Sequence, residues 1–156
     1  MKKSSICLVL ASILLGGPAM VFAQAGAAAK GRTVNITGND TMKYDTTTIT
    51  AKPGETLHIV LKNVGSMPKI AMAHNVVILK PGTDASAFTS AGMTSRETEF
   101  IAPAMKANVL AATKLAGAGE TVDLTFKVPA KPATYTFVCT FPGHFAAGMQ
   151  GTIVAK

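Results

Sequence analysis

Short stretches in which apolar and polar residues alternate recur along most of this 156-residue chain. The clearest covers residues 121–128, where every second side chain from Val122 to Val128 is apolar, and residues 56–62 repeat the pattern from Leu57. A period of two puts the apolar side chains on one face of a β-strand and the polar ones on the other. Each stretch therefore predicts a strand with one buried face and one face in water.

Six further stretches of β-type composition are separated by residues that favour turns. They cover residues 34–36, 47–50, 74–79, 109–112, 134–139 and 152–154, and turn signals include Pro53-Gly54 and Pro81-Gly82. Eight short strands at this spacing predict an all-β sandwich or barrel. Residues 83–100 differ, because they are rich in Ala, Ser, Met and charge without a period of two, and we expect one short helical excursion there.

The composition divides the chain into three parts. Residues 1–23 carry Lys2 and Lys3, then an apolar run and small residues up to Ala23, which is the pattern of a cleaved secretory signal. The apolar run is shorter than the roughly 20 residues that cross a bilayer, so we expect cleavage and export to the periplasm rather than membrane tethering. Residues 24–31 are rich in Ala and Gly and predict a flexible segment, and residues 32–156 are expected to form one domain.

The charge of the chain is basic but scattered. The chain has 15 basic and 8 acidic side chains, and removal of Lys2 and Lys3 with the signal would change the net charge from +7 to +5. Such a charge favours a partner with an acidic face or an anionic lipid surface. The lysines form no basic stripe, so nucleic acid is not expected as a partner.

Removal of the signal would also discard Cys7 and leave Cys139 as the one cysteine of an exported protein. An intramolecular disulfide would then be impossible, and an exposed thiol would be oxidised in such a compartment. We therefore expect burial or a bound metal to protect Cys139.

Cys139 opens a short segment with three metal donors. Its thiol, the imidazole of His144 and the thioether of Met149 follow one another at equal gaps. A thiolate and imidazoles with a weak axial thioether are the donors of blue-copper electron-transfer sites, which also need a second imidazole. Alone, each residue is more simply a buried hydrophobe, a loop histidine or a core filler, but the three together predict a copper site.

His74 is the best candidate for the remaining donor. It begins the predicted strand 74–79 and can stand at a sheet edge that faces another loop. His58 lies between Leu57 and Ile59, so strand alternation points its side chain to water, and it is not expected to bind metal.

Two other uses of these residues fit the sequence less well. A nucleophilic pair of Cys139 and His144 would need an orienting group and an oxyanion hole, and no obvious carboxylate or carboxamide lies near His144 in the sequence. Structural zinc sites commonly use more cysteines and no thioether. We therefore expect neither enzyme activity nor a small-molecule substrate.

At these residues the sequence resembles the azurins and auracyanins, bacterial members of the cupredoxin family of blue copper proteins. The resemblance runs from about Val34 to Lys156. Four segments carry it, with the sequences TGNDTMKY at 37–44, MAHNV at 72–76, TKLAGAGE at 113–120 and CTFPGH at 139–144.

The resemblance implies a Greek-key β-sandwich of about eight strands with one type 1 copper ion at one end. In this family pattern copper would be bound by His74, Cys139 and His144, with Met149 as the axial ligand. Ala73 occupies the position of an azurin glycine whose carbonyl approaches copper from the second axial side, so the Ala73 carbonyl would be at most a weak axial contact.

The resemblance also assigns roles around the ligands. The backbone N–H groups of Asn75 and Phe141 would donate to the Cys139 sulfur, and the Asn75 side chain would join the two ligand loops. The edge of His144 would be the electron port. The patch around it would consist of Met72, Met93, Phe145 and Ala146.

The sequence departs from the azurins in three further places. The region of the azurin N-terminal disulfide holds Arg32 and Pro53-Gly54, so that disulfide is absent. Four residues, rather than three, separate His144 from Met149, as in the auracyanins. Val76 replaces the core tryptophan of some azurins.

The sequence supports three hypotheses of different classes. The first is an exported carrier of single electrons between redox proteins, such as cytochromes or membrane respiratory or photosynthetic complexes. The second is a copper chaperone or copper-buffering protein that uses the same ligands. The third, a metal-free adhesive sandwich, would require the whole donor set to be coincidental.

Overall fold

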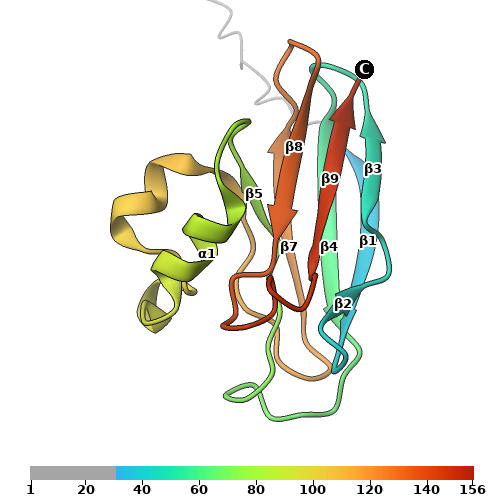
Figure 1. Ribbon diagram of the computed structural model, residues 1–156. Helices are drawn as coiled ribbons and strands as arrows, with labels where there is room; N and C mark the ends of the chain where they lie inside the picture. Colours follow the sequence, from blue (N-terminus) through green and yellow to red (C-terminus); the bar gives the residue numbers. More distant parts are fainter. Residues whose placement is uncertain (1–30) are drawn as a thin grey trace, which may run out of the picture.

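Two β-sheets packed face to face form the body of the protein in the computed structural model, which describes residues 31–156 (Figure 1). The first sheet has the order β2-β1-β4-β7. Its strands are β1 (Arg32–Asn39), β2 (Lys43–Tyr44), β4 (Thr56–Asn63) and β7 (Thr121–Lys127). The second sheet has the order β3-β9-β8-β5-β6. Its strands are β3 (Thr48–Ala51), β5 (Val77–Leu79), β6 (Val109–Ala112), β8 (Ala133–Val138) and β9 (Gln150–Ala155).

The predicted all-β Greek-key sandwich is confirmed, with nine strands in place of about eight. The additional strand is β2, which pairs with the end of β1 across a tight turn and is too short to show a period of two. Both sheets are mixed, because β1 runs parallel to β4 and β3 runs parallel to β9. The predicted signal and nearly all of the predicted flexible segment lie outside the described residues.

The interior between the sheets is built by the alternation seen in the sequence. Leu57, Ile59 and Leu61 of β4 are completely buried, and Phe126 of β7 and Phe137 of β8 join the same core. Full burial of one large apolar side chain contributes about 1.5–3 kcal/mol, so these faces hold the sheets together. The core continues to Cys139, which places the copper-donor loop at its edge.

The predicted helical excursion is confirmed and extends further than expected. It contains α1 (Ala85–Gly92) and the 3-10 helices η1 (Arg96–Thr98) and η2 (Pro103–Asn108), so it ends beyond residue 100. Asp84 caps α1 by accepting hydrogen bonds from the backbone N–H groups of Ser86 and Ala87. Phe88 buries the inner face of α1 in a second apolar cluster on the outer side of β5 and β8. None of the helices within residues 31–156 is long and apolar enough to cross a membrane.

The prediction of a strand over 74–79 was wrong at its start, because β5 covers only Val77–Leu79. His74 instead forms an isolated antiparallel bridge with Ala116, in which each backbone N–H donates to the other residue's carbonyl, at 3.0 and 2.7 Å. The apolar run of the sequence continues through this bridge, so composition alone did not mark the boundary.

Candidate metal centre

The predicted donors meet at one end of the sandwich. Two loops converge there: residues 64–76, which join β4 to β5, and residues 139–149, which join β8 to β9 (Figure 1). The turn between β1 and β2 lies at the same end, beside the end of β4, since Gly38 of β1 pairs with Asn63. Segments far apart in the sequence therefore surround a single point.

His74, Cys139 and His144 form the one cluster of His, Cys, Asp or Glu in the described chain whose donor atoms could together hold a metal ion. The Nδ1 atoms of His74 and His144 are 3.3 Å apart, and the Cys139 Sγ lies 3.4 Å from the His144 Nδ1. All three donor atoms lie within 4.8 Å of one another, and all three residues are buried.

These separations fit donors that share one metal ion. Nitrogen and sulfur ligands lie about 2.0 and 2.3 Å from a first-row metal such as zinc, so two such donors are separated by roughly 3.3–3.8 Å. One thiolate and two imidazoles also match the in-plane donors of a blue-copper site. The residues present therefore fit copper.

Met149 lies against the same cluster. Its side chain is completely buried, and Gly38 on β1 packs against both Met149 and His74. A Cβ atom at position 38 would lie 3.0 Å from the Met149 methyl group and 2.9 Å from the His74 ring. Glycine at this position therefore leaves the space that the thioether and the imidazole occupy, although its φ angle is ordinary.

The segment 139–149 closes on itself through its own backbone. The N–H of Cys139 donates to the Met149 carbonyl at 3.1 Å, and the N–H of Met149 donates to the His144 carbonyl at 2.9 Å. Gly143 and Gly148 have φ angles of 85° and 90°, which a residue with a side chain rarely adopts. Three donors are thus positioned by one compact loop.

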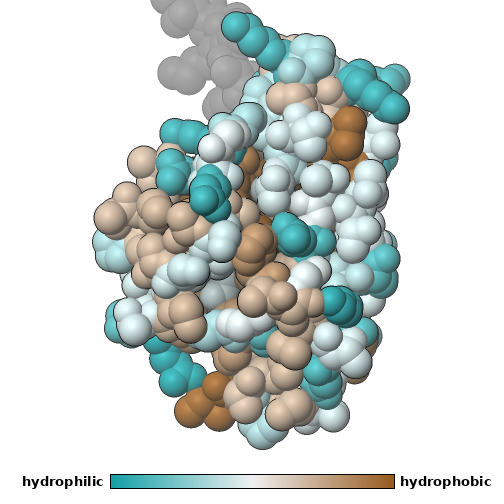
Figure 2. Space-filling view, viewed as in Figure 1, coloured by the Kyte–Doolittle hydropathy of each residue, from teal (hydrophilic) through white to brown (hydrophobic). Residues whose placement is uncertain are grey.

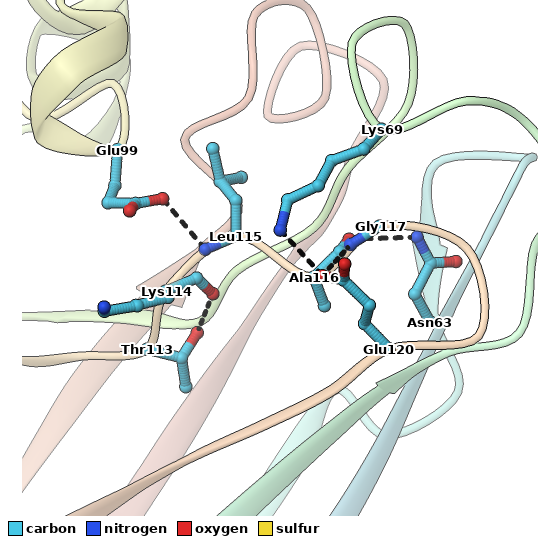
Figure 3. Close-up of polar contacts among 9 residues, drawn as sticks. All are labelled: Asn63, Lys69, Glu99, Thr113, Lys114, Leu115, Ala116, Gly117 and Glu120. Carbon is cyan, nitrogen blue, oxygen red and sulfur yellow. Dashed lines mark hydrogen bonds and ion pairs between the residues drawn. The ribbon is translucent and has the colours of Figure 1, made fainter.

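His74 is positioned by residues outside its own segment. Its bridge partner Ala116 is in turn fixed by Asn63, whose side-chain amide donates to the Ala116 carbonyl at 3.1 Å (Figure 3). The Tyr44 hydroxyl on β2 donates to the carbonyl of Asn75, and the Thr113 hydroxyl accepts from the N–H of Val76 at 3.0 Å. The peptide that follows Asn75 is thus held at both its oxygen and its nitrogen.

Asn75 also joins the two donor segments. Its side-chain amide donates to the Thr140 hydroxyl at 2.8 Å, and its side-chain oxygen accepts from the Thr140 N–H at 2.9 Å. The Thr140 hydroxyl then donates to the backbone carbonyl of Glu99 at 2.6 Å. The sequence did not indicate a role for Tyr44 or Glu99. The Tyr44 hydroxyl binds the carbonyl of Asn75, 31 residues away, and the Glu99 carbonyl binds the hydroxyl of Thr140, 41 residues away.

The thiol of Cys139 is strongly affected by burial. Removal from water raises its pKa to about 11, while the backbone N–H groups of Asn75 and Phe141 and the Tyr44 hydroxyl act in the opposite direction. These groups stabilise the thiolate form that a metal requires. Without metal the sulfur keeps its proton at neutral pH.

Both imidazoles are neutral at the same pH. Burial lowers the pKa of His144 to about 4, with a further contribution from the nearby His74. Burial also lowers the pKa of His74, although the Asp40 carboxylate and the Asn39 backbone oppose the effect. Neutral imidazole is the form that binds metal, so only the thiol has to lose a proton.

The residues predicted to surround the electron port lie at different depths. Ala146 and Met93 are exposed and Phe145 is half-buried, whereas Met72 is 8% exposed and His144 only 2%. The Ala73 carbonyl oxygen lies 3.9 Å from the Cys139 sulfur and therefore borders the cluster. His58 is outside the cluster, as expected, and its Nε2 lies 2.8 Å from an Asp123 carboxylate oxygen on the outer face of the first sheet.

Comparison with known proteins agrees with this geometry. Residues 31–156 match the family described as copper binding proteins, plastocyanin/azurin family. The chain is 40% identical to azurin of Alcaligenes faecalis over 123 residues, covering 77% of this chain and 94% of that one. It is 34% identical to auracyanin-A of Chloroflexus aurantiacus over 116 residues, covering 74% and 68% of the two chains.

A similar solved structure is the reduced auracyanin of the photosynthetic bacterium Roseiflexus castenholzii. The two structures have a TM-score of 0.70 and 32% sequence identity, covering 81% of this chain and 98% of the auracyanin. The family match spans the complete sandwich and all four donors. The chain therefore belongs to the plastocyanin/azurin family of copper-binding proteins and is a blue copper electron-transfer protein.

Proposed function

We propose that this protein carries single electrons between redox proteins in the periplasm, with one copper ion bound by His74, Cys139, His144 and Met149. The observation that carries the proposal is the convergence of two imidazoles and one thiol at 3.3–3.4 Å beside a buried thioether. Bound copper supplies the chemistry, since it accepts and releases one electron between its Cu(II) and Cu(I) states.

The chain contributes a fixed and dry set of donors. Cys139 and Met149 are completely buried and His144 is 2% exposed, so the donors are shielded from water. Hydrogen bonds from Asn75 and Phe141 to the sulfur, together with the clamp between Asn75 and Thr140, hold the ligands in one arrangement. A fixed arrangement reduces the structural change that accompanies each electron transfer.

The burial of all the proposed ligands also argues against catalysis on a substrate. A catalytic metal site keeps one open coordination position for a substrate or water, as catalytic zinc sites do. Here a fourth buried side chain, Met149, lies against the cluster, and the Ala73 carbonyl oxygen lies 3.9 Å from the Cys139 sulfur. We therefore propose a carrier and not an enzyme.

The electron port proposed here is the surface over His144. Apolar surface gathers over α1 and over the loop between β8 and β9 (Figure 2). Met93, Phe145 and Ala146 contribute to it, and Met72 lies beneath. An apolar patch with few charges allows a small and short-lived contact, which suits a carrier that must leave its partner after each transfer.

Spectroscopy of the copper-loaded protein tests the site. The Cu(II) form of the wild-type protein is expected to show an intense visible band from the thiolate–copper bond. Cys139→Ala should abolish this band, whereas Thr134→Ala, an exposed change in the strand that leads into Cys139, should leave it intact. A wild-type Cu(II) protein without the band, or a Cys139→Ala variant that keeps it, would refute the proposal.

Metal exchange separates the carrier from the alternative of a copper chaperone or buffer. A site with buried donors should release Cu(I) slowly to a chelator of modest affinity and should exchange electrons with a soluble cytochrome. Rapid loss of Cu(I) without electron exchange would favour the chaperone. Export is tested by expressing the whole chain in a Gram-negative host, where the periplasmic protein should begin at Gln24 or Gly26.

A further inference from the structure

A groove of about 570 Å³ lies beside the metal centre and adjoins the apolar patch over Phe145, since Phe141 lines both. It is bounded by the 64–76 loop, by the turn that follows η1, by residues 114–115 and by the donor loop, residues 139–149. Lys69, Arg96 and Lys114 lie on its rim, and Phe100 and Phe141 form its aromatic floor. We call this surface the basic groove.

The floor of the basic groove touches a proposed copper ligand. The ring centroid of Phe141 lies 4.7 Å from that of His144, and Phe100 packs edge-on against Phe141 at 5.3 Å. Phe141 also follows Cys139 by only two residues. A partner seated in the groove would therefore come close to two ligands, and electron transfer slows steeply with distance.

The backbone holds this floor in an unusual conformation. Glu99 and Phe100 are consecutive residues with φ angles of 58°, a left-handed conformation that is costly for residues other than glycine. The Glu99 carbonyl accepts a hydrogen bond from the Thr140 hydroxyl at 2.6 Å, which ties the strained turn to the donor loop. Strain of this kind concentrates at functional sites, where the surrounding structure maintains it.

Three cations and two carboxylates line the basic groove, so its net charge is +1, and two of the cations form no ion pair within the described residues. Glu120 pairs with Lys69 at 2.7 Å and accepts from the Gly117 N–H, and the Glu99 carboxylate accepts from the Leu115 N–H at 2.9 Å (Figure 3). The ion pairs within residues 31–156 are those of Arg32, His58 and Lys69, so neither Arg96 nor Lys114 takes part in one.

We propose that the basic groove is a second docking surface, which receives an acidic segment of a redox partner protein. The free cations of Arg96 and Lys114 would attract carboxylates, and the aromatic floor would place the partner beside His144 and Cys139. Complementary charge speeds and orients such an encounter. This proposal rests on the electron-carrier function proposed above.

The first test uses the apo-protein, so that it measures anion binding to the basic groove independently of the copper chemistry. Hexacyanochromate(III), a paramagnetic trianion, serves as a probe for partner carboxylates in an NMR titration of the 15N-labelled protein. Broadening should concentrate on the amides of Arg96, Phe100, Lys114 and Leu115. Broadening spread evenly over the lysines, or concentrated elsewhere, would overturn the proposal.

Charge reversal provides the second test, with a matched control. The double variant Arg96→Glu/Lys114→Glu should lose the localised broadening, whereas Lys127→Glu/Lys131→Glu, with the same charge change at the opposite end of the sandwich, should keep it. In the copper-loaded protein, electron exchange with hexacyanoferrate at low salt should fall about tenfold or more only in the first variant. Equal losses in both variants would show that net charge alone acts.

A milder variant and a lipid-binding measurement distinguish the remaining explanations. Arg96→Gln/Lys114→Gln provides a milder change should the glutamate variant fail to fold, and circular dichroism reports the fold of each. Binding of the wild-type protein to phosphatidylglycerol vesicles through Arg96 and Lys114, without localised broadening by the trianion, would assign the groove to lipid and overturn the proposal. A missing visible band with intact broadening would refute the carrier function while leaving the anion-binding groove in place.

Discussion

The two segments that carry the metal donors are built in different ways. Residues 139–149 supply three donors, and hydrogen bonds within that short loop, such as those between Cys139, His144 and Met149, give it its shape. Residues 72–76 supply one donor, and His74 is held by contacts with distant parts of the chain, including Ala116 and β2. One half of the site is thus local, and the other half exists only in the folded sandwich.

This difference has a consequence for stability and for metal binding. The local loop can keep its turns when distant parts of the protein change, whereas the His74 segment depends on every element around it. Changes that loosen the His74 segment should therefore damage the site while the Cys139 loop remains intact.

Asn75→Leu should have the largest effect, because it removes the clamp between the two segments. The Thr140 N–H loses its buried acceptor, and a buried unsatisfied group costs about 1–3 kcal/mol, while the Thr140 hydroxyl loses one hydrogen bond but still donates to the Glu99 carbonyl. We expect the free energy of unfolding of the apo-protein to fall by about 2–5 kcal/mol in urea denaturation. Thr140→Ser, which keeps the hydroxyl, should cost only about 1 kcal/mol. A wild-type stability for Asn75→Leu would mean that the segments are held independently.

Acidification should have the next largest effect on stability, because it protonates a buried imidazole of the site. Because the pKa of His144 is about 4 in the folded apo-protein and near 6.5 when unfolded, the unfolded chain binds more protons between these values. Stability is then complete above about pH 6.5 and is lost as the pH falls toward 4, by up to roughly 3 kcal/mol.

Urea denaturation at a series of pH values measures this loss, and NMR titration of the ring protons assigns it. The His144 signals should titrate near pH 4, and His74 should also titrate below its usual range because burial lowers its pKa. Stability that is constant from pH 7 to 4, or a His144 pKa near 6.5, would contradict the burial of this imidazole.

Gly38→Ala should disturb both donor segments at the point where they meet, because His74 and Met149 both pack against this glycine. The added methyl group would lie about 3.0 Å from both the His74 ring and the Met149 methyl group, so both must move. Overpacking of this kind costs roughly 1–3 kcal/mol. Urea denaturation should show this loss, and the visible spectrum of the Cu(II) protein should shift. Gly54→Ala is a useful comparison because it has a positive φ but no atom within 4 Å, and it should leave the spectrum unchanged.

His58→Ala should have the smallest effect. His58 pairs with Asp123 on the outer face of the first sheet, where both side chains are more than a third exposed, and surface pairs contribute about 0–1 kcal/mol. Copper affinity and the visible band should not change, whereas His74→Ala should weaken both. Loss of the band in His58→Ala would mean that the assignment of the second imidazole is wrong.

Much of the fold could be predicted because its pattern is local. Alternation in residues 56–62 and 121–128 marked the two strands correctly, since a period of two fixes which side chains face the core. The break near residue 83 likewise marked the start of the helical region. Strand β2 and the start of β5 were missed, because a pairing of two residues and an isolated bridge leave no periodic signal.

The donor chemistry follows from the sequence alone, since Cys139, His144 and Met149 lie within one short segment and their chemical types limit the metal. The position of His74, the groups that hold Asn75 and the burial of Met72 depend instead on the folded protein. These features differ from the donor spacing because the interactions behind them act over a longer range in the sequence. Turns and alternation act over a few residues, whereas a buried hydrogen bond between Tyr44 and Asn75 exists only after both sheets have packed.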